Sequence, residues 1–201
     1  MVEIIGRNLE EIYNAIKGDG RLAALIDQLR AALECFTENE RDISLRENVI
    51  FKQFADKILS ESERAAYYNL PEGCRMREGA KIYSPERLKC GKHVWIGENA
   101  IIDASGGLEI GDHTTVASSV FVWTHSSHLA NVNMANYPGS DLRILKPTKI
   151  GSGVFIGGPS VVTAGTTIGD RTVVLPLSCV TKDFDGNCMI GGSPARFIKS
   201  L

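Results

Sequence analysis

Two closely spaced histidines, His125 and His128, are the side chains of this sequence whose type best suits proton transfer. Histidine titrates near neutral pH, so it can take a proton from a hydroxyl or amino group that is a poor nucleophile by itself. His93 and His113 stand at variable positions of a repeat, where polar residues usually face solvent, and we predict that both are surface residues. The chemistry is therefore expected at His125 and His128.

The five cysteines are predicted to be reduced packing residues rather than a reactive or metal-binding centre. Their number is odd, they are widely spaced, and they form neither a CxxC pair nor a zinc-finger pattern with histidine. A nucleophilic cysteine would need a neighbouring base and an activating environment, which the sequence does not suggest. They are Cys35, Cys74, Cys90, Cys179 and Cys188.

Charge and hydropathy exclude two classes of partner. The 201 residues carry a formal charge of −2 and contain no block or stripe of Lys and Arg, so nucleic acid is not expected. Residues 1–9 lack the unbroken apolar core of a signal peptide, and no stretch approaches the ~20 apolar residues of a membrane span. We therefore expect a cytoplasmic protein without a membrane segment.

Residues 1–72 are predicted to form a helical N-terminal region, because apolar residues recur there at intervals of three and four. Thr37 with Glu40, and Ser60 with Glu63, have the spacing of a helix capping box. Gly18-Asp19-Gly20 separates the first two helices. The clearest apolar stripe consists of Leu22, Leu25, Ile26, Leu29 and Leu33.

From residue 73 onward a repeat of six residues replaces the helical pattern. Small residues stand two positions before the repeated aliphatic residue, as a narrow interior would require, and glycine often follows it, as a sharp corner would favour. The aliphatic residues are Ile150, Ile156, Val162, Ile168, Val174 and Val180 in one run, and Cys90, Ile96, Ile102, Ile110, Val116 and Val122 in an earlier one.

A unit of six residues is too short to bury its own aliphatic side chain, so such units must stack into a continuous core. We therefore predict a β-solenoid over residues 73–201. The repeat breaks after Val122 and resumes at Ile150, so a loop at about 123–148 must leave the coils. Loops of this length are often functional, and His125 and His128 lie in this one.

The repeat resembles that of the hexapeptide-repeat acyltransferases, for example in Ile-Gly-Asp-Arg-Thr-Val from Ile168 and Ile-Gly-Asp-His-Thr-Thr from Ile110. Gly192-Ser193-Pro194-Ala195-Arg196 is similar to the closing signature of that family, and Thr181-Lys182-Asp183 strengthens the match. The resemblance covers residues 80–201. It implies a mainly β fold, a left-handed parallel β-helix, and a homotrimer with active sites between subunits.

The resemblance also implies transfer of an acyl group from acetyl-CoA without a metal. In the sugar O-acetyltransferase branch, the catalytic base lies at the start of an extended loop, a place that His125 matches. The coenzyme is expected along the second run of coils, where a glycine corner lets a backbone amide approach the oxyanion. Its expected ligands are Phe155, Gly157, Gly158, Thr181, Lys182 and Arg196.

Asp103 and His128 are the residues expected on the acceptor side. By the same resemblance, Asp103 lies where related enzymes often place a polar residue facing the acceptor, and the alternative is a solvated corner carboxylate. His128 could orient His125, contact the acceptor or face solvent. Phe155 replaces a tryptophan that is frequent in the sugar enzymes, and the loop is longer than in the galactoside and maltose enzymes, which leaves the acceptor open.

Three functions remain open from the sequence. The leading one is acetylation of a hydroxyl of a sugar or polysaccharide precursor, with His125 as general base. The alternatives are acetylation of the amino group of a nucleotide-linked sugar and a trimeric scaffold without catalysis. Carbonic anhydrases of the γ class share the solenoid, but His125 and His128 are too close together to match their zinc ligands.

Overall fold

The computed structural model describes residues 59–135 and 142–201. The chain divides into two compact units, Met1–Phe54 and Ala55–Leu201, and the described residues all belong to the second. Several sequence expectations lie outside the described residues: the stripe from Leu22 to Leu33, the turn at Gly18–Gly20, the pair Thr37 and Glu40, and Cys35.

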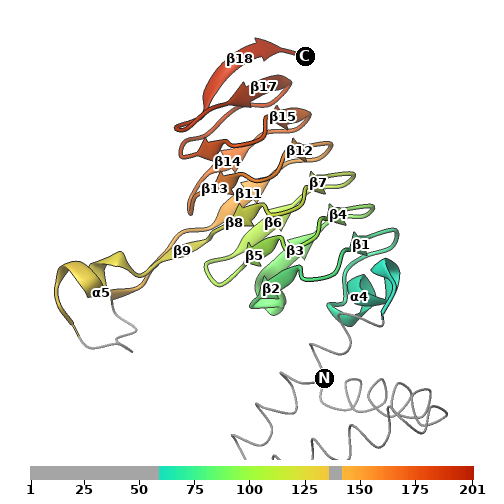
Figure 1. Ribbon diagram of the computed structural model, residues 1–201, viewed down its shortest axis with the longest axis horizontal. Helices are drawn as coiled ribbons and strands as arrows, with labels where there is room; N and C mark the ends of the chain where they lie inside the picture. Colours follow the sequence, from blue (N-terminus) through green and yellow to red (C-terminus); the bar gives the residue numbers. More distant parts are fainter. Residues whose placement is uncertain (1–58, 136–141) are drawn as a thin grey trace, which may run out of the picture. The chain divides into compact units, whose positions relative to one another are not determined.

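The described chain is a parallel β-helix with three faces, which we call A, B and C (Figure 1). Each coil adds one short strand to each face, and strands of successive coils pair in parallel, so the fold predicted from the repeat is confirmed. Face A contains β1 (Arg75–Met76), β4 (Trp95–Ile96), β7 (Thr115–Val116), β12 (Phe155–Ile156), β15 (Thr172–Val174), β17 (Cys188–Gly191) and β18 (Arg196–Ser200). Face B contains β2 (Lys81–Tyr83), β5 (Ile101–Asp103), β8 (Phe121–Val122), β13 (Val161–Val162) and β16 (Cys179–Val180). Face C contains β3 (Leu88–Cys90), β6 (Leu108–Ile110), β11 (Thr148–Ile150) and β14 (Thr167–Ile168).

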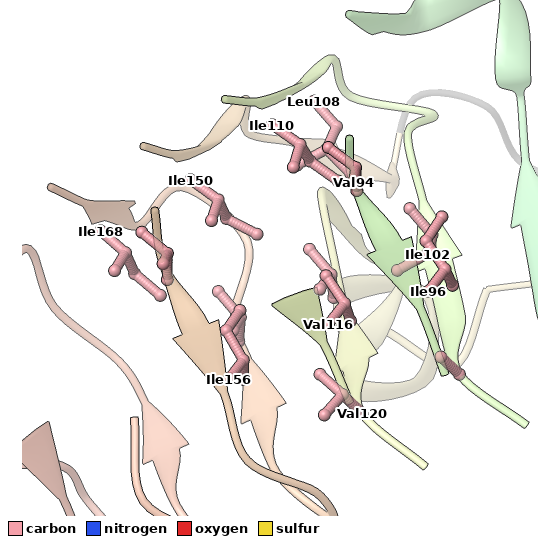
Figure 2. Close-up of a cluster of buried hydrophobic side chains, with 14 of the residues drawn as sticks. Val94, Ile96, Ile102, Leu108, Ile110, Val116, Val120, Ile150, Ile156 and Ile168 are labelled. Atoms are coloured by element: carbon pink, nitrogen blue, oxygen red, sulfur yellow. The ribbon is translucent and has the colours of Figure 1, made fainter. Parts of the chain in front are cut away.

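The repeated aliphatic residues fill the interior of the coils (Figure 2). On face C, Ile150 pairs with Ile110 on one side and with Ile168 on the other. All six residues of the uninterrupted run are at most 1% exposed, and the small residues two positions before them are also buried. Since burial of one such side chain contributes about 1.5–3 kcal/mol, stacking of these rows holds the coils together.

The glycines that follow the aliphatic residues are required by close packing between coils, not by the sharp corner that was expected to favour them. Gly111 lacks a positive φ, but a Cβ there would lie 2.6 Å from the carbonyl carbon of Gly151 in the next coil. The left-handed conformation falls two residues later at the same corners, at His93 and His113, whose φ values are 57° and 55°.

Helix α4 (Glu61–Tyr67) packs against the first coil, and the antiparallel strand β18 pairs with β17 at the other end. The predicted capping box is present, with Ser60 at the N-cap and Glu63 bonded back to it. Ala65 is buried in the same apolar cluster as the coils. No helix in residues 59–135 or 142–201 is long and apolar enough to cross a membrane.

The chain leaves the coils after β8 and returns at β11, as the break in the repeat predicted. Strand β9 (His125–Ser126) pairs antiparallel with β10 (Ile144–Leu145), and helix α5 (His128–Val132) follows β9. We call this excursion the arm; Figure 1 shows it projecting away from the coils. A short 3-10 helix, η1 (Pro85–Arg87), forms a smaller excursion between β2 and β3.

We predict that Ile150→Ala lowers the free energy of unfolding by about 2–5 kcal/mol, because the substitution leaves a cavity in the row of stacked aliphatic side chains. Lys149→Ala, at the neighbouring exposed position, is the control and should leave stability nearly unchanged. Urea unfolding followed by circular dichroism measures both. Equal losses of unfolding free energy in the two variants would contradict the assignment of Ile150 to the interior and Lys149 to the surface.

Candidate active site

The site lies at the corner between faces B and C, where the arm begins. The amide of Lys146 donates to the carbonyl of Thr124 at 2.8 Å, and the Thr148 hydroxyl donates to the carbonyl of Trp123 at 2.8 Å. These two bonds tie the outgoing chain to the returning chain at the root of the arm. His125 follows immediately, so its backbone is anchored to the coils.

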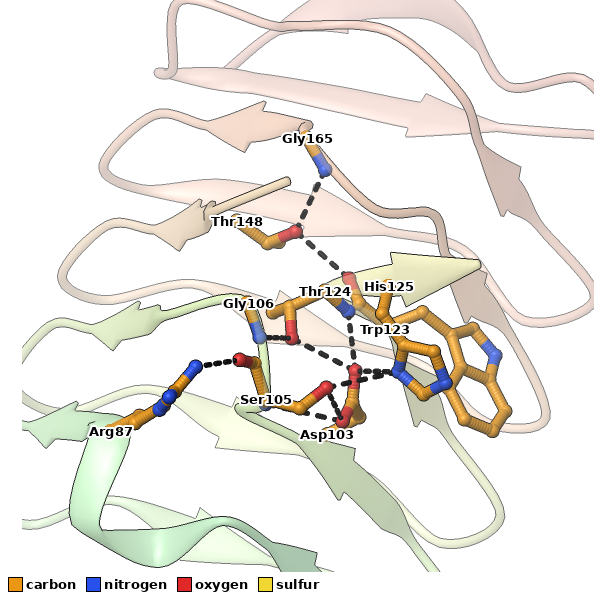
Figure 3. Close-up of polar contacts among 9 residues, drawn as sticks. All are labelled: Arg87, Asp103, Ser105, Gly106, Trp123, Thr124, His125, Thr148 and Gly165. Atoms are coloured by element: carbon orange, nitrogen blue, oxygen red, sulfur yellow. Dashed lines mark hydrogen bonds and ion pairs between the residues drawn. The ribbon is translucent and has the colours of Figure 1, made fainter. Parts of the chain in front are cut away.

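Asp103 and His125 are brought together from successive coils (Figure 3). The Nδ1 atom of His125 lies 2.8 Å from Oδ2 of Asp103, which is the last residue of β5. The Asp103 side chain is only 1% exposed. Thr124 donates its amide and its hydroxyl to Oδ2, each at 2.8 Å, and the Ser105 hydroxyl donates to Oδ1 at 2.7 Å. The carboxylate is therefore saturated with donors.

These donors keep Asp103 ionised although it is buried. Burial raises the pKa of the carboxyl, but the hydrogen bonds from Ser105, His125 and Thr124 outweigh that effect and bring the pKa to about 2, against a usual value of 3.8. An ionised Asp103 can only accept, so Nδ1 of His125 carries the proton between them. The neutral imidazole then has its lone pair on Nε2.

The Nε2 atom of His125 is the ring nitrogen that remains accessible in this arrangement. The imidazole is 27% exposed, and among residues 59–135 and 142–201 no side chain or backbone group hydrogen bonds Nε2. A histidine held through Nδ1 by a carboxylate, with an accessible Nε2, is arranged to remove a proton from a bound group and to be stabilised as the cation.

Ser105, Gly106 and Thr124 support this pair, although they were not among the residues predicted from the sequence. The Gly106 amide donates to the Thr124 hydroxyl at 2.8 Å, and a Cβ on Gly106 would collide with the Thr124 carbonyl oxygen. The Arg87 side chain, at the end of η1, donates to the Ser105 carbonyl at 2.6 Å. The available signal was the two-residue insertion around Ser105-Gly106-Gly107, which lengthens the interval between Ile102 and Ile110 from six residues to eight.

Asp103 is not the solvated corner carboxylate that the alternative expected, because the Thr124 and Ser105 contacts enclose its side chain behind His125. Its position facing the acceptor stays a prediction. His128 is exposed at the start of α5, and its Nδ1 lies 2.7 Å from the Ser126 hydroxyl. Of the three roles considered for His128, the orientation of His125 belongs to Asp103 instead.

Two of the expected coenzyme ligands share the corner with His125. The register of face B aligns Val122 with Val162 and Val162 with Val180, so Thr181 and Lys182 come at the same corner two coils further on. The Nζ atom of Lys182 lies 5.4 Å from the ring centroid of Phe184. Thr181 and Lys182 therefore lie in line with His125 along the solenoid.

The other expected ligands lie elsewhere on the chain. Phe155 is 45% exposed on face A, and Gly157-Gly158 form the corner between faces A and B. A Cβ on Gly158 would collide with the Ser118 carbonyl oxygen of the preceding coil, so packing alone already requires this glycine. Arg196 follows Ala195 in the last turn, where the Ala195 amide bonds the Cys179 carbonyl at 2.8 Å.

The remaining candidate groups form no second centre among the described residues. His93 and His113 are exposed, as predicted, and their rings stack with centroids 4.8 Å apart. The four described cysteines are free. No group of three or more His, Cys, Asp or Glu side chains in the described part of the chain is arranged to hold a metal.

The chain is similar to known proteins in its repeat, its sequence and its fold. Residues 147–174 match a family model described as the hexapeptide repeat of succinyl-transferase. The chain is 28% identical to an E. coli acetyltransferase of colanic acid biosynthesis, WcaF, over 62% of this chain and 64% of that protein. It is 28% identical to the E. coli galactoside O-acetyltransferase over 78% of each chain. It is 32% identical to an acetyltransferase of Dictyostelium discoideum over 61% of this chain and 67% of that protein.

A solved structure of a hexapeptide-repeat acetyltransferase from Vibrio cholerae is also similar. It is 26% identical, has a TM-score of 0.66, and the match covers 82% of this chain and 94% of that one. The same protein has been solved with acetyl coenzyme A, and that structure matches with 27% identity and a TM-score of 0.62, over 82% of this chain and 91% of that one.

The lowered pKa of Asp103 predicts how acid affects stability. Because the folded-state pKa lies below the usual value, the ionised carboxylate stabilises the fold above about pH 4, and this contribution is lost as the pH falls towards 2. The difference in free energy of unfolding between the wild type and Asp103→Asn should therefore shrink over that interval. Urea unfolding from pH 2 to 7 measures it, and a difference independent of pH would contradict the assignment.

Proposed function

This chain belongs to the hexapeptide-repeat acetyltransferase family, and we propose that it transfers an acetyl group from acetyl-CoA to a hydroxyl of a sugar or polysaccharide precursor. The observation that carries the proposal is the pair of Asp103 and His125, which leaves Nε2 free to act as a base. The acetyl-CoA complex of the similar Vibrio cholerae protein supports the donor. The galactoside and colanic acid relatives support a sugar acceptor.

In the proposed reaction, Nε2 of His125 takes the proton of the acceptor hydroxyl while its oxygen attacks the thioester carbonyl carbon. The ionised Asp103 stabilises the imidazolium that forms. The tetrahedral intermediate then breaks its carbon–sulfur bond, and the coenzyme leaves as the thiol after it receives the proton from His125. The scheme requires neither a covalent enzyme intermediate nor a metal.

The proposed coenzyme site needs two copies of the chain. Thr181 and Lys182 share a corner with His125, whereas Phe155, Gly157 and Gly158 lie on face A and at the corner between faces A and B. Residues on two different edges of one solenoid can meet around one ligand if neighbouring solenoids pack side by side. We therefore propose a homotrimer with sites between subunits, in which Arg196 binds coenzyme phosphates and His128 contacts the acceptor.

We propose that the protein acts in the cytoplasm. The four described cysteines are unpaired, as expected in a reducing compartment. A cytoplasmic enzyme also has direct access to acetyl-CoA and to precursors before their assembly into polysaccharide.

The trimer is tested by size-exclusion chromatography with light scattering, which should give three times the 21.9 kDa mass of the chain. Phe155→Ala should raise the KM for acetyl-CoA about tenfold, because it removes apolar surface that would pack against the pantetheine arm. Full activity of a species with the mass of a single chain would contradict the shared site.

The base is tested by measuring thiol release from acetyl-CoA in the presence of a panel of sugars and sugar nucleotides. His125→Ala should lower kcat by about 10²–10⁴-fold while binding of coenzyme A, measured by calorimetry, is retained. His113→Ala, which removes an exposed histidine outside the site, is the matched control and should leave kcat nearly unchanged.

Several outcomes would contradict the proposal. Retention of activity in His125→Ala would show that His125 is not the general base. Failure of the wild type to bind coenzyme A would favour a scaffold without catalysis. An N-linked product, identified by mass spectrometry and NMR, would replace transfer to a hydroxyl with transfer to the amino group of a nucleotide-linked sugar.

A further inference from the structure

Trp123 is the aromatic side chain next to the proposed base. Its indole meets the His125 imidazole edge to face, with ring centroids 6.0 Å apart and planes at 85°. The indole also lies beside the Phe121 ring: the two ring planes are nearly parallel, at 7°, and the ring centroids are 6.4 Å apart. Figure 3 shows Trp123 and His125 projecting side by side at the end of the corner. Neither Asp103 nor its hydrogen-bond donors require an aromatic residue at position 123.

The backbone of Trp123 is hydrogen bonded on both sides to the coils. Its amide donates to the Val162 carbonyl at 2.9 Å, and its carbonyl accepts from the Thr148 hydroxyl at 2.8 Å. The Thr148 hydroxyl in turn accepts from the Gly165 amide at 3.0 Å. These bonds anchor the backbone from which the indole projects towards the imidazole.

The position of the indole relative to Nε2 limits what can bind beside it. A hydroxyl that gives its proton to Nε2 must lie about 2.6–3.2 Å from that atom. The carbon skeleton that carries this hydroxyl then extends several ångströms further. The indole can contact this skeleton, because its ring centroid lies 6.0 Å from that of the imidazole. The indole is half-buried, so part of its apolar surface remains available to such a skeleton.

We propose that Trp123 is the acceptor platform of this enzyme and that it selects pyranose rings by stacking against their flat C–H face. This inference rests on the proposed function, since it concerns the acceptor of the same reaction. A pyranose chair has axial C–H groups that form a continuous apolar patch, whereas an open-chain polyol with the same hydroxyls has no rigid patch to stack. Trp123 would thus distinguish acceptors by ring shape while His125 distinguishes the reacting hydroxyl.

The sequence allows a direct binding measurement, because it contains only two tryptophans. In the full-length Trp95→Phe variant, Trp123 is the single source of indole fluorescence. Methyl galactopyranoside and methyl glucopyranoside should change this emission saturably, with no acetyl-CoA present. Galactitol and glucitol, which carry hydroxyls without a ring, should leave it unchanged at the same concentrations.

Kinetics in the same Trp95→Phe background give the second readout. Trp123→Leu should raise the KM for the methyl pyranosides about tenfold, while kcat and the KM for acetyl-CoA stay within about twofold. Trp123→Phe keeps a flat apolar face and should restore most of the lost affinity. If the indole only supported the His125 ring, Trp123→Leu would instead lower kcat for every acceptor, and this result would overturn the proposal.

The two proposals fail in different ways. Pyranoside-dependent fluorescence without any acetyl transfer would refute the proposed reaction and leave the platform standing. Acetyl transfer to pyranosides with silent Trp123 fluorescence and an unchanged acceptor KM in Trp123→Leu would refute the platform alone. A rise in the KM for acetyl-CoA instead of the acceptor KM would show that the indole faces the coenzyme and would also overturn the inference.

Discussion

Every other feature of this molecule depends on the contact between one coil and the next. A coil contains short strands of two to four residues and cannot enclose the aliphatic residue that each strand points inward. Only stacking converts these residues into rows such as Ile110, Ile150 and Ile168. The same constraint removes side chains from positions like Gly111, where the backbones of adjacent coils approach too closely for a Cβ.

Stacking also explains why the candidate site is rigid although it lies at the root of a long excursion. Asp103 comes from one coil and His125 follows the strand of the next coil, so the register between the two coils sets the distance between Oδ2 and Nδ1. The donors to Asp103 come from the residues that flank the pair on both coils, Ser105 and Thr124. A buried carboxylate is unfavourable by itself, and here the corner supplies the hydrogen bonds that keep it charged.

The fold was predictable from the sequence because the repeat places the same side-chain type at the same interval many times. The break between Val122 and Ile150 also identified the arm, and the capping box of Ser60 and Glu63 identified the start of α4. The details of the site were less accessible. Asp103 and His125 are 22 residues apart, and their contact arises from the register between two coils, which the inserted residues at 105–107 obscure. The glycine corners were found for the wrong reason, since torsion and packing favour the same residue type.

The hydrogen bonds at the root of the arm make the geometry at His125 independent of the length and composition of the arm. The bonds from Lys146 and Thr148 to residues 124 and 123 complete the coil before the excursion begins, so the coils beyond β11 resume as though no residues had been added. The length and composition of the chain between β9 and β10 can then vary in evolution without changing the stacked coils or the geometry at His125. Related chains could therefore carry different arms at this corner and keep the same contact between Asp103 and His125, so that the arm and the coils can diverge independently in evolution.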